Sequence, residues 1–224
     1  AAPGFDEIMC LGKLYDLAEG SDGKAEFDTI VFDAALTSGG AGSILLTGGQ
    51  MDITQALTIN GPGADLLTID AQSNSRIFAT AGGSFGLTLS GLTLTGGEAS
   101  SDGGAVFFGT TGDLTLDQVS VTGSRTTGNS AEGGGIFAQG NVVLTSSTVS
   151  GNSTTGDSSS GGGILANGDV TLINTTVSGN STSGGNSVGG VIEVVARGVP
   201  AGLGAPISSE KFSGATQLPS VAPR

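Results

Sequence analysis

Residues 86–190 repeat one pattern four times. The copies are Leu87-Thr-Leu-Ser-Gly-Leu-Thr-Leu-Thr-Gly96, Leu114-Thr-Leu-Asp-Gln-Val-Ser-Val-Thr-Gly123, Val142-Val-Leu-Thr-Ser-Ser-Thr-Val-Ser-Gly151 and Val170-Thr-Leu-Ile-Asn-Thr-Thr-Val-Ser-Gly179. Their closing glycines are 27, 28 and 28 residues apart. A fixed period of this length is the sequence signature of a stacked-repeat fold.

Each copy predicts short strands. Apolar residues alternate with hydroxyl residues, which is the two-residue period of a strand with one buried face. There is no 3.6-residue apolar stripe, and β-branched residues with glycines disfavour a helix. A short apolar pair after each glycine cluster adds a third strand. We therefore predict an all-β fold, a right-handed parallel β-helix (a solenoid) whose coils stack about 4.8 Å apart.

Stacking turns each apolar column of the repeat into an inward ladder. Two such ladders are predicted, and their members are Leu89, Leu116, Leu144 and Leu172 in the first and Leu94, Val121, Val149 and Val177 in the second. Each inward aliphatic side chain stabilises the fold by roughly 1.5–3 kcal/mol when fully buried. Asn152 and Asn180 lie one coil apart, and we expect them to form an internal amide ladder at a turn.

Composition narrows the functional classes. A net charge of −13 opposes nucleic-acid binding, and no apolar run is long enough to span a membrane. With 42 glycines and 4% aromatic residues, a compact α/β enzyme core is disfavoured. The single cysteine, Cys10, excludes an internal disulfide. No signal-peptide pattern opens the chain, so we expect a processed product or an excerpt.

The chain divides into three predicted parts. Residues 1–26 hold a capping α-helix over residues 3–20, with Pro3-Gly4 at its start and Gly20 after its end. This helix would cover the open apolar end of the first coil. The β-helix follows over residues 27–195, and a Pro-rich, irregular tail over residues 196–224.

The candidate chemistry lies on one outward column. Asp113, Asn141 and Asp169 recur at 28-residue steps, and Asp117 and Arg125 are weak candidates for the same surface. One interpretation is a metal or sugar contact, and the other is a turn residue that opens each strand. We favour the turn, because stacked carboxylates repel by roughly 1 kcal/mol near water. The chain has no histidine, which removes Ser-His and His-metal sites.

A hydroxyl column is also predicted on the outer surface. Thr88, Thr115 and Thr171 share one position of the repeat, and Val143 interrupts them. A regular threonine array suits ice or crystalline sugar, but the interruption favours an ordinary solvated strand face.

The repeats resemble a known class of protein. Gly161-Gly-Gly-Ile-Leu-Ala-Asn-Gly-Asp-Val-Thr-Leu-Ile-Asn-Thr-Thr-Val-Ser-Gly-Asn180 and Leu57-Thr-Ile-Asn-Gly-Pro-Gly-Ala-Asp-Leu-Leu-Thr-Ile-Asp-Ala71 carry the likeness. About residues 28–190 look like bacterial secreted or surface β-helix proteins of the pectin-lyase-like superfamily, including autotransporter passengers. The resemblance implies an extracellular or cell-surface location. It is specific to the architecture and not to one activity.

The two ends resemble other proteins. Residues 2–34 are similar to an interior piece of anion-pump ATPases (the arsenite and tail-anchored-protein-targeting family), without the phosphate-binding loop. Residues 187–204 look like an interior piece of chorismate synthase. The joins fall in Phe27–Asp33 and Ser187–Gly190, which suggests a chimera stitched by short overlaps.

Three functions follow as hypotheses. The first is a non-enzymatic, acidic structural or adhesin-like module, and the second is a carbohydrate-active protein that binds or cleaves polysaccharide. The third is a stitched sequence with no selected function. We expect no cofactor and no metal, and we expect polysaccharide or cell-surface components as partners. Open coil ends also make end-to-end self-association possible.

Overall fold

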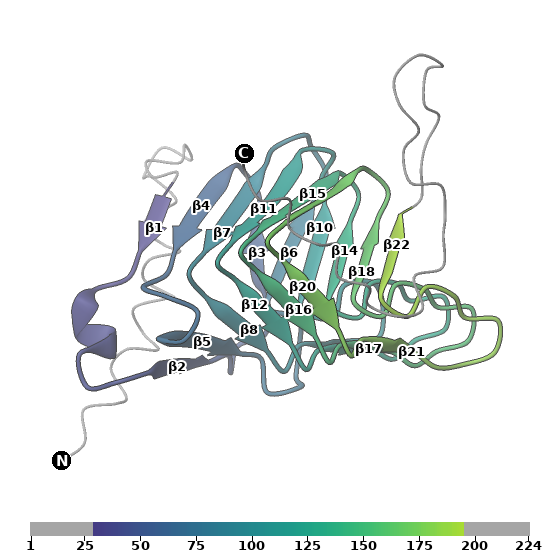
Figure 1. Ribbon diagram of the computed structural model, residues 1–224, viewed down its shortest axis with the longest axis horizontal. Helices are drawn as coiled ribbons and strands as arrows, with labels where there is room; N and C mark the ends of the chain where they lie inside the picture. Colours follow the sequence, from purple (N-terminus) through teal and green to yellow (C-terminus); the bar gives the residue numbers. More distant parts are fainter. Residues whose placement is uncertain (1–28, 195–224) are drawn as a thin grey trace, which may run out of the picture.

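Residues 29–194 are described by the computed structural model, and they form a parallel β-solenoid (Figure 1). Within this range, three of the sheets have six strands each, with one strand from each coil. The strands of these sheets pair in parallel, and the coils follow one another along the long axis. The predicted all-β parallel solenoid is therefore confirmed.

The strands of one sheet come from successive coils. The first sheet contains β1 (Thr29–Val31), β4 (Leu57–Asn60), β7 (Leu87–Ser90), β11 (Asp113–Asp117), β15 (Asn141–Thr145) and β19 (Val170–Ile173). The second contains β2 (Gly42–Leu45), β5 (Leu67–Asp70), β8 (Thr93–Thr95), β12 (Ser120–Thr122), β16 (Thr148–Ser150) and β20 (Thr176–Ser178). The third contains β3 (Met51–Ile53), β6 (Phe78–Ala81), β10 (Val106–Gly109), β14 (Ile136–Ala138), β18 (Ile164–Ala166) and β22 (Ile192–Val194).

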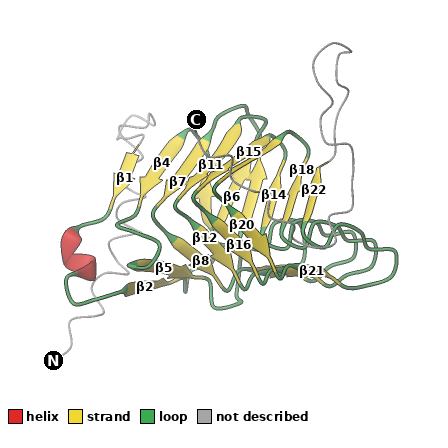
Figure 2. Ribbon diagram, viewed as in Figure 1, coloured by secondary structure: helices red, strands yellow, loops and turns green. Residues whose placement is uncertain are grey.

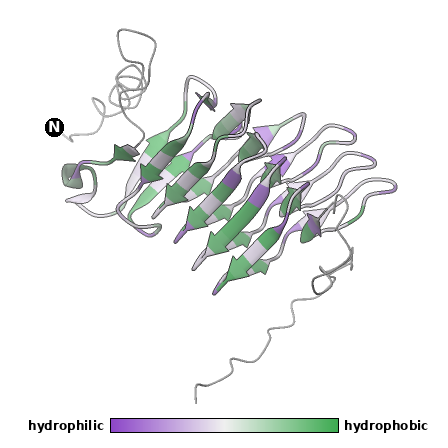
Figure 3. Ribbon diagram, turned by 90° about the horizontal axis from the view of Figure 1, so that it is seen from above, coloured by the Kyte–Doolittle hydropathy of each residue, from purple (hydrophilic) through white to green (hydrophobic). Residues whose placement is uncertain are grey.

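Side chains alternate between core and surface as the sequence requires. In β7, Leu87 and Leu89 are fully buried, whereas Thr88 and Ser90 lie on the outer face. The register then places inward side chains of neighbouring coils side by side, and Leu89 lies beside Leu116 of the next coil. The same column continues through Leu144 to Leu172. In Figure 3 the strands carry most of the hydrophobic colouring, in agreement with this arrangement.

Two further columns complete the core. In the second sheet, Leu94 pairs with Val121, and the pairing continues through Val149 to Val177. In the third sheet, one column runs Met51, Phe78, Val106, Ile136, Ile164 and Ile192. The three columns face one another across a single apolar interior. No coil could bury its column alone, so the stack is the folding unit.

The glycine that closes each copy is required by the backbone. Gly96, Gly123, Gly151 and Gly179 follow the strands of the second sheet, and their φ angles are 63°, 62°, 63° and 62°. This is the left-handed region, where a residue with a Cβ costs about 1–2 kcal/mol. The constant step between these glycines therefore arises because each one forms the same corner of its coil.

A fourth sheet was not predicted. It contains the two-residue strands β9 (Glu98–Ala99), β13 (Arg125–Thr126), β17 (Ser153–Thr154) and β21 (Ser181–Thr182). The sequence analysis predicted three strands for each coil and no strand at these residues. The prediction was wrong for the last four coils, because two residues are too few to show an alternating pattern.

The loops after the fourth sheet cover the outer face of the third sheet. Leu165 points outward by its register, yet it is fully buried, and Phe137 is nearly so. The loop glycines Gly133 and Gly161 lie directly against the strands that carry these side chains. The phenyl rings of Phe107 and Phe137 stack with centroids 5.3 Å apart. A second, smaller apolar layer therefore lies outside the main core.

The two ends of the described solenoid differ from its middle. Leu172 belongs to the inward column but is 40% exposed in the last coil. The first coil contains the one helix of the described residues, the 3₁₀ helix η1 (Ala34–Thr37), which Asp33 caps by accepting from the Ala35 N–H (Figure 2). The predicted helix over residues 3–20 and the tail over residues 196–224 lie outside the described residues. The domain boundaries stay predictions.

Candidate functional site

The acidic column predicted from the sequence lies on the outer face of the first sheet. Asp113 pairs with Asn141 in the register, and Asn141 Nδ2 donates to Asp113 Oδ1 over 2.9 Å. In the next coil, the Asp169 N–H donates to Asn141 Oδ1, also over 2.9 Å. All three side chains are exposed. The intervening amide separates the two carboxylates and links three coils, which is the arrangement expected of a strand-opening residue.

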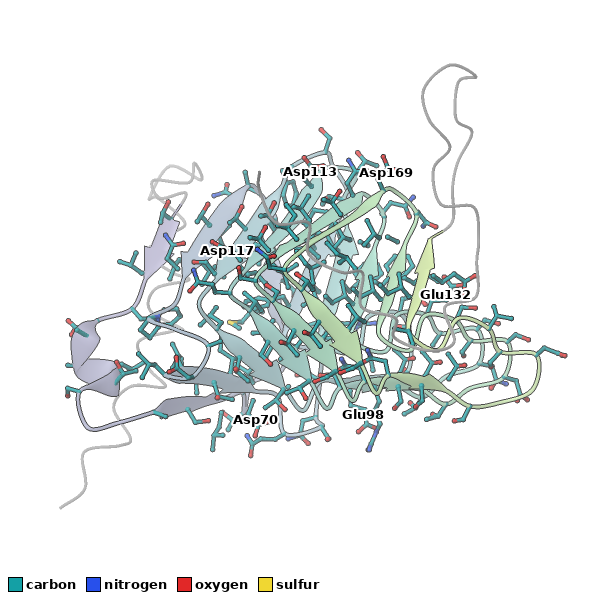
Figure 4. The ribbon with its side chains drawn as sticks, viewed as in Figure 1. Asp70, Glu98, Asp113, Asp117, Glu132 and Asp169 are labelled. Atoms are coloured by element: carbon teal, nitrogen blue, oxygen red, sulfur yellow. The ribbon has the colours of Figure 1, made fainter. Side chains whose placement is uncertain are left out.

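Asp117 and Arg125 do not join this column. Asp117 ends β11 in the first sheet, whereas Arg125 lies in β13 of the fourth sheet. The Arg125 Nη2 forms an ion pair with Glu98 Oε2 at 2.6 Å, in the preceding coil. Figure 4 shows the labelled carboxylates dispersed over the solenoid and not gathered around one groove. The candidate surface of Asp113, Asp117, Asp169 and Arg125 is therefore not assembled.

Two absences apply to the described part of the chain. Within residues 29–194, no three His, Cys, Asp or Glu side chains are grouped so that they could hold a metal ion. In the same range, the structure contains no helix with the length and hydrophobicity of a membrane span.

Asn152 and Asn180 lie inside the solenoid, at the corner between the second and fourth sheets. Asn152 is fully buried, and its Nδ2 donates to Asn180 Oδ1 and to the Val121 carbonyl, at 3.0 Å each. Its Oδ1 accepts from the Ser124 N–H at 2.9 Å. Ser124 occupies the same corner one coil earlier. The column therefore satisfies backbone groups that the corner would otherwise leave unpaired in the core.

The outward threonine column of the first sheet is longer than predicted. The register continues Thr88, Thr115, Val143 and Thr171 backwards through Thr58 to Thr29. Val143 interrupts this column and presents methyl groups there. The outer face of the first sheet therefore carries both hydroxyl and methyl groups.

The second sheet presents a more uniform surface, which the sequence analysis missed. Four of its six strands, β8, β12, β16 and β20, have hydroxyl residues at both outward positions. We call these eight side chains the hydroxyl face: Thr93, Thr95, Ser120, Thr122, Thr148, Ser150, Thr176 and Ser178. They repeat about every 6.6 Å along a strand and about every 4.8 Å between strands. No charged or aromatic side chain interrupts them.

The hydroxyl face differs from the acidic column and from the fourth sheet in its hydrogen bonding. On those two surfaces, neighbouring coils pair polar side chains, as in Asn141 with Asp113 and Arg125 with Glu98. On the hydroxyl face, only Thr93 has a side-chain partner within residues 29–194, the Ala64 carbonyl at 2.6 Å. The other seven hydroxyls face outward with donor and acceptor capacity unused by the described chain.

A sequence signal for this face exists. Each closing glycine follows a Ser/Thr-x-Ser/Thr triplet whose middle residue is a member of the inward column, as in Thr93-Leu94-Thr95. The two flanking positions must then point outward. The threonine column predicted from the sequence belongs to the first sheet alone.

A second polar cluster lies at the loops that cover the third sheet. Arg76 spans neighbouring coils, since its Nε donates to the Asp102 carbonyl at 2.8 Å and its Nη1 to Gln50 Oε1 at 3.2 Å. Its guanidinium also lies over the Phe107 ring, 5.4 Å from the centroid. Burial lowers the pKa of Arg76, and the carboxylates of Asp102 and Asp52 act in the opposite direction.

Glu132 is the acid with a perturbed environment in this cluster. Burial raises the pKa of its carboxyl above the ordinary value, and the neighbouring carboxylates of Asp102 and Glu193 raise it further. The Glu132 N–H donates to Asp102 Oδ1 at 2.9 Å, which holds the two residues together. Sequence reasoning did not select Glu132, because its burial depends on the covering loops.

Comparisons with known proteins add no family assignment. No protein-family model, curated protein or solved structure matches the chain.

Proposed function

We propose that the protein is a non-enzymatic, adhesin-like module of the cell surface or the extracellular space. It would bind a neutral, repetitive, hydroxyl-rich solid such as a crystalline polysaccharide through the hydroxyl face. The observation that carries this proposal is the regular array of eight Ser and Thr side chains on β8, β12, β16 and β20, with seven of its hydroxyls unpaired within the described chain. The resemblance of the repeats to surface β-helix proteins supports the location.

The physical argument depends on repetition. One protein–sugar hydrogen bond replaces bonds to water and contributes only about 0.5–1.5 kcal/mol net. A rigid array multiplies that contribution when the ligand repeats with a compatible period, because the later contacts form within one complex. The ladders of the core fix the spacing of the array before binding. An ordered polymer surface therefore gains more from this face than a free sugar does.

Charge selects the class of polymer. The chain carries a net charge of −13, and no cation lies among the eight positions of the hydroxyl face. Long-range repulsion disfavours pectate and other acidic polysaccharides at low ionic strength. Neutral polymers such as cellulose or chitin meet no such barrier.

The test compares two isosteric double variants. Thr95→Val/Thr122→Val removes two neighbouring hydroxyls from the hydroxyl face, and Thr88→Val/Thr115→Val makes the same change in the same coils on the first sheet. Valine already occupies the outward column of the first sheet at Val143, so the solenoid accepts this residue on an outer face. Both variants should therefore fold. Pull-down on insoluble cellulose and chitin should show roughly tenfold or greater weakening for the first variant alone, at about 1 kcal/mol for each hydroxyl. Equal binding by both variants would contradict the proposal.

Ice is a second arm of the same experiment. Inhibition of ice recrystallisation that disappears in Thr95→Val/Thr122→Val, without polysaccharide binding, would assign the face to ordered water. No binding to any solid by the unmodified chain would overturn the binding proposal.

A carbohydrate-active enzyme is the second candidate, and one observation favours it. Glu132 has a raised pKa beside the carboxylate of Asp102, which is the environment of a general acid. Turnover of neutral and acidic polysaccharides, with and without Ca²⁺, tests it. Robust cleavage that is lost in Glu132→Gln would establish the enzyme and overturn the non-enzymatic proposal.

The stitched-sequence hypothesis stays a separate prediction. Sequencing the encoding DNA from its source as one uninterrupted molecule would contradict it.

A further inference from the structure

The first column of the hydroxyl face continues beyond the four strands that define the face. This column contains Thr93 and Ser120, and the register extends it backwards through Thr68 of β5 to Ser43 of β2. It therefore has a hydroxyl residue on each of the six strands of the second sheet. Within residues 29–194, the hydroxyls of Ser43 and Thr68 have no hydrogen-bond partner. The array is thus longest across the strands, along the axis of the solenoid.

The second column of the face ends in a charged group. It contains Thr95, and the register extends it backwards to Asp70 of β5 and then to Leu45 of β2. The Asp70 side chain points outward, because Ile69 before it is buried in the core, and Figure 4 shows Asp70 on the outer side of the solenoid. Leu45 has no hydrogen-bonding side chain. The carboxylate of Asp70 is therefore the last polar group of this column.

The carboxylate of Asp70 is held in position on the face. Its Oδ1 accepts a hydrogen bond from the Gln72 N–H at 2.7 Å. The same oxygen lies close to Gly96, where an added Cβ would overlap it. Within residues 29–194, Oδ2 accepts no hydrogen bond, and the one ion pair of this range joins Arg125 to Glu98. Asp70 therefore presents a fixed acceptor oxygen that has no cationic partner in the described chain.

We propose that Asp70 binds the free amino group of an amino polysaccharide, such as partly deacetylated chitin, that lies along the hydroxyl face. A carboxylate only accepts hydrogen bonds, and a charged donor forms bonds roughly twice as strong as a neutral one, so an ammonium group is its best partner. The net charge of −13 also attracts a polymer with many amino groups at low ionic strength. The proposal rests on the binding function of the hydroxyl face and narrows its ligand to a polymer with amines.

Soluble oligomers of equal length test the role of the amine. Chitosan and chitin oligomers differ in N-acetylation alone, and calorimetric titration of the full chain compares them directly. The chitosan oligomer should bind about fivefold more tightly at low ionic strength, and Asp70→Asn should remove this difference. The new amide can still accept from the Gln72 N–H through its Oδ1, so the turn should be retained. Asp113→Asn removes the same charge from the first sheet and should keep most of the preference. Equal losses in the two variants would assign the effect to net charge and overturn the proposal.

The variant Thr95→Val/Thr122→Val separates this proposal from the one on which it rests. It should weaken the binding of both oligomers, whereas Asp70→Asn should weaken the binding of the chitosan oligomer alone. If the hydroxyl face binds cellulose and chitin but the unmodified chain does not prefer the chitosan oligomer, the role of Asp70 is overturned and the binding function stands. Chitosan binding that Thr95→Val/Thr122→Val leaves unchanged would also overturn the proposal. Binding of neither oligomer and of no solid would overturn both.

Discussion

The Nδ2 of Asn152 donates to Asn180 Oδ1 over 3.0 Å inside the solenoid, one coil apart. The same amide group accepts from the Ser124 N–H and donates to the Val121 carbonyl. One side chain thus joins three coils at a corner where the Ser124 N–H has a side-chain acceptor in place of a backbone carbonyl. Hydrogen bonds, and not apolar contacts alone, fix the stacking of this corner.

Asn152→Ala should destabilise the protein strongly. It leaves the buried Ser124 N–H without a partner, at about 1–3 kcal/mol, and removes the amide donor to the Val121 carbonyl and to Asn180 Oδ1. The matched control is Asn141→Ala, which removes two hydrogen bonds from the surface, where water replaces them. Urea unfolding should show a much lower midpoint for the Asn152 variant than for the control. Equal midpoints would contradict a structural role for the buried amide.

The position of a leucine along its column should decide its contribution. Leu116→Ala creates a cavity in a closed part of the core and should lower the free energy of unfolding by about 2–5 kcal/mol. Leu172→Ala makes the same change in the same column, but Leu172 is 40% exposed, so the loss should be below about 2 kcal/mol. Denaturant unfolding of the two variants measures the difference. A larger loss at Leu172 would show that another part of the chain covers the last coil.

Two glycines should differ in their tolerance of alanine. A Cβ at Gly134 would overlap the carbonyl oxygens of Ser153 and Gly162, so Gly134→Ala must displace the loop, at about 3 kcal/mol or more. At Gly151 the backbone has a φ of 63°, but the nearest atom is 3.9 Å from a new Cβ. Gly151→Ala should then cost only about 1–2 kcal/mol of conformational strain. Urea unfolding measures the two losses, and limited proteolysis reports whether the loop is displaced. A smaller loss for Gly134→Ala than for Gly151→Ala would contradict the prediction.

Glu132 should make stability depend on pH. Its pKa is raised in the folded protein by burial and by nearby carboxylates, so the folded chain binds this proton more readily than the unfolded chain. Its contribution is therefore fully present below the unfolded pKa and is lost as the pH rises through the raised folded value. Glu132→Gln should raise the Tm relative to the unmodified protein more at pH 7 than at roughly pH 4. Thermal unfolding at the two pH values tests this, and a constant difference would contradict it.

The surface chemistry was only partly predictable. The sequence identified Asp113, Asn141 and Asp169 as one column and favoured a turn role, and the structure shows these groups bonded to one another. It missed Glu132 and the hydroxyl face. The burial of Glu132 depends on the path of a loop, which the local sequence does not encode. The hydroxyl face is encoded by the Ser/Thr-x-Ser/Thr triplets before each closing glycine.

The sequence by itself determined the coil. A period of 27 or 28 residues, alternating side chains and a recurring glycine are local properties of the chain, and they decide which side chains point inward. Only the tertiary structure decided what lies beside each outward side chain. Leu165 is buried because a loop folds over it, and Arg125 pairs with Glu98 because their strands are neighbours. Alternation encodes the direction of a side chain, whereas its surroundings depend on the path of loops between coils.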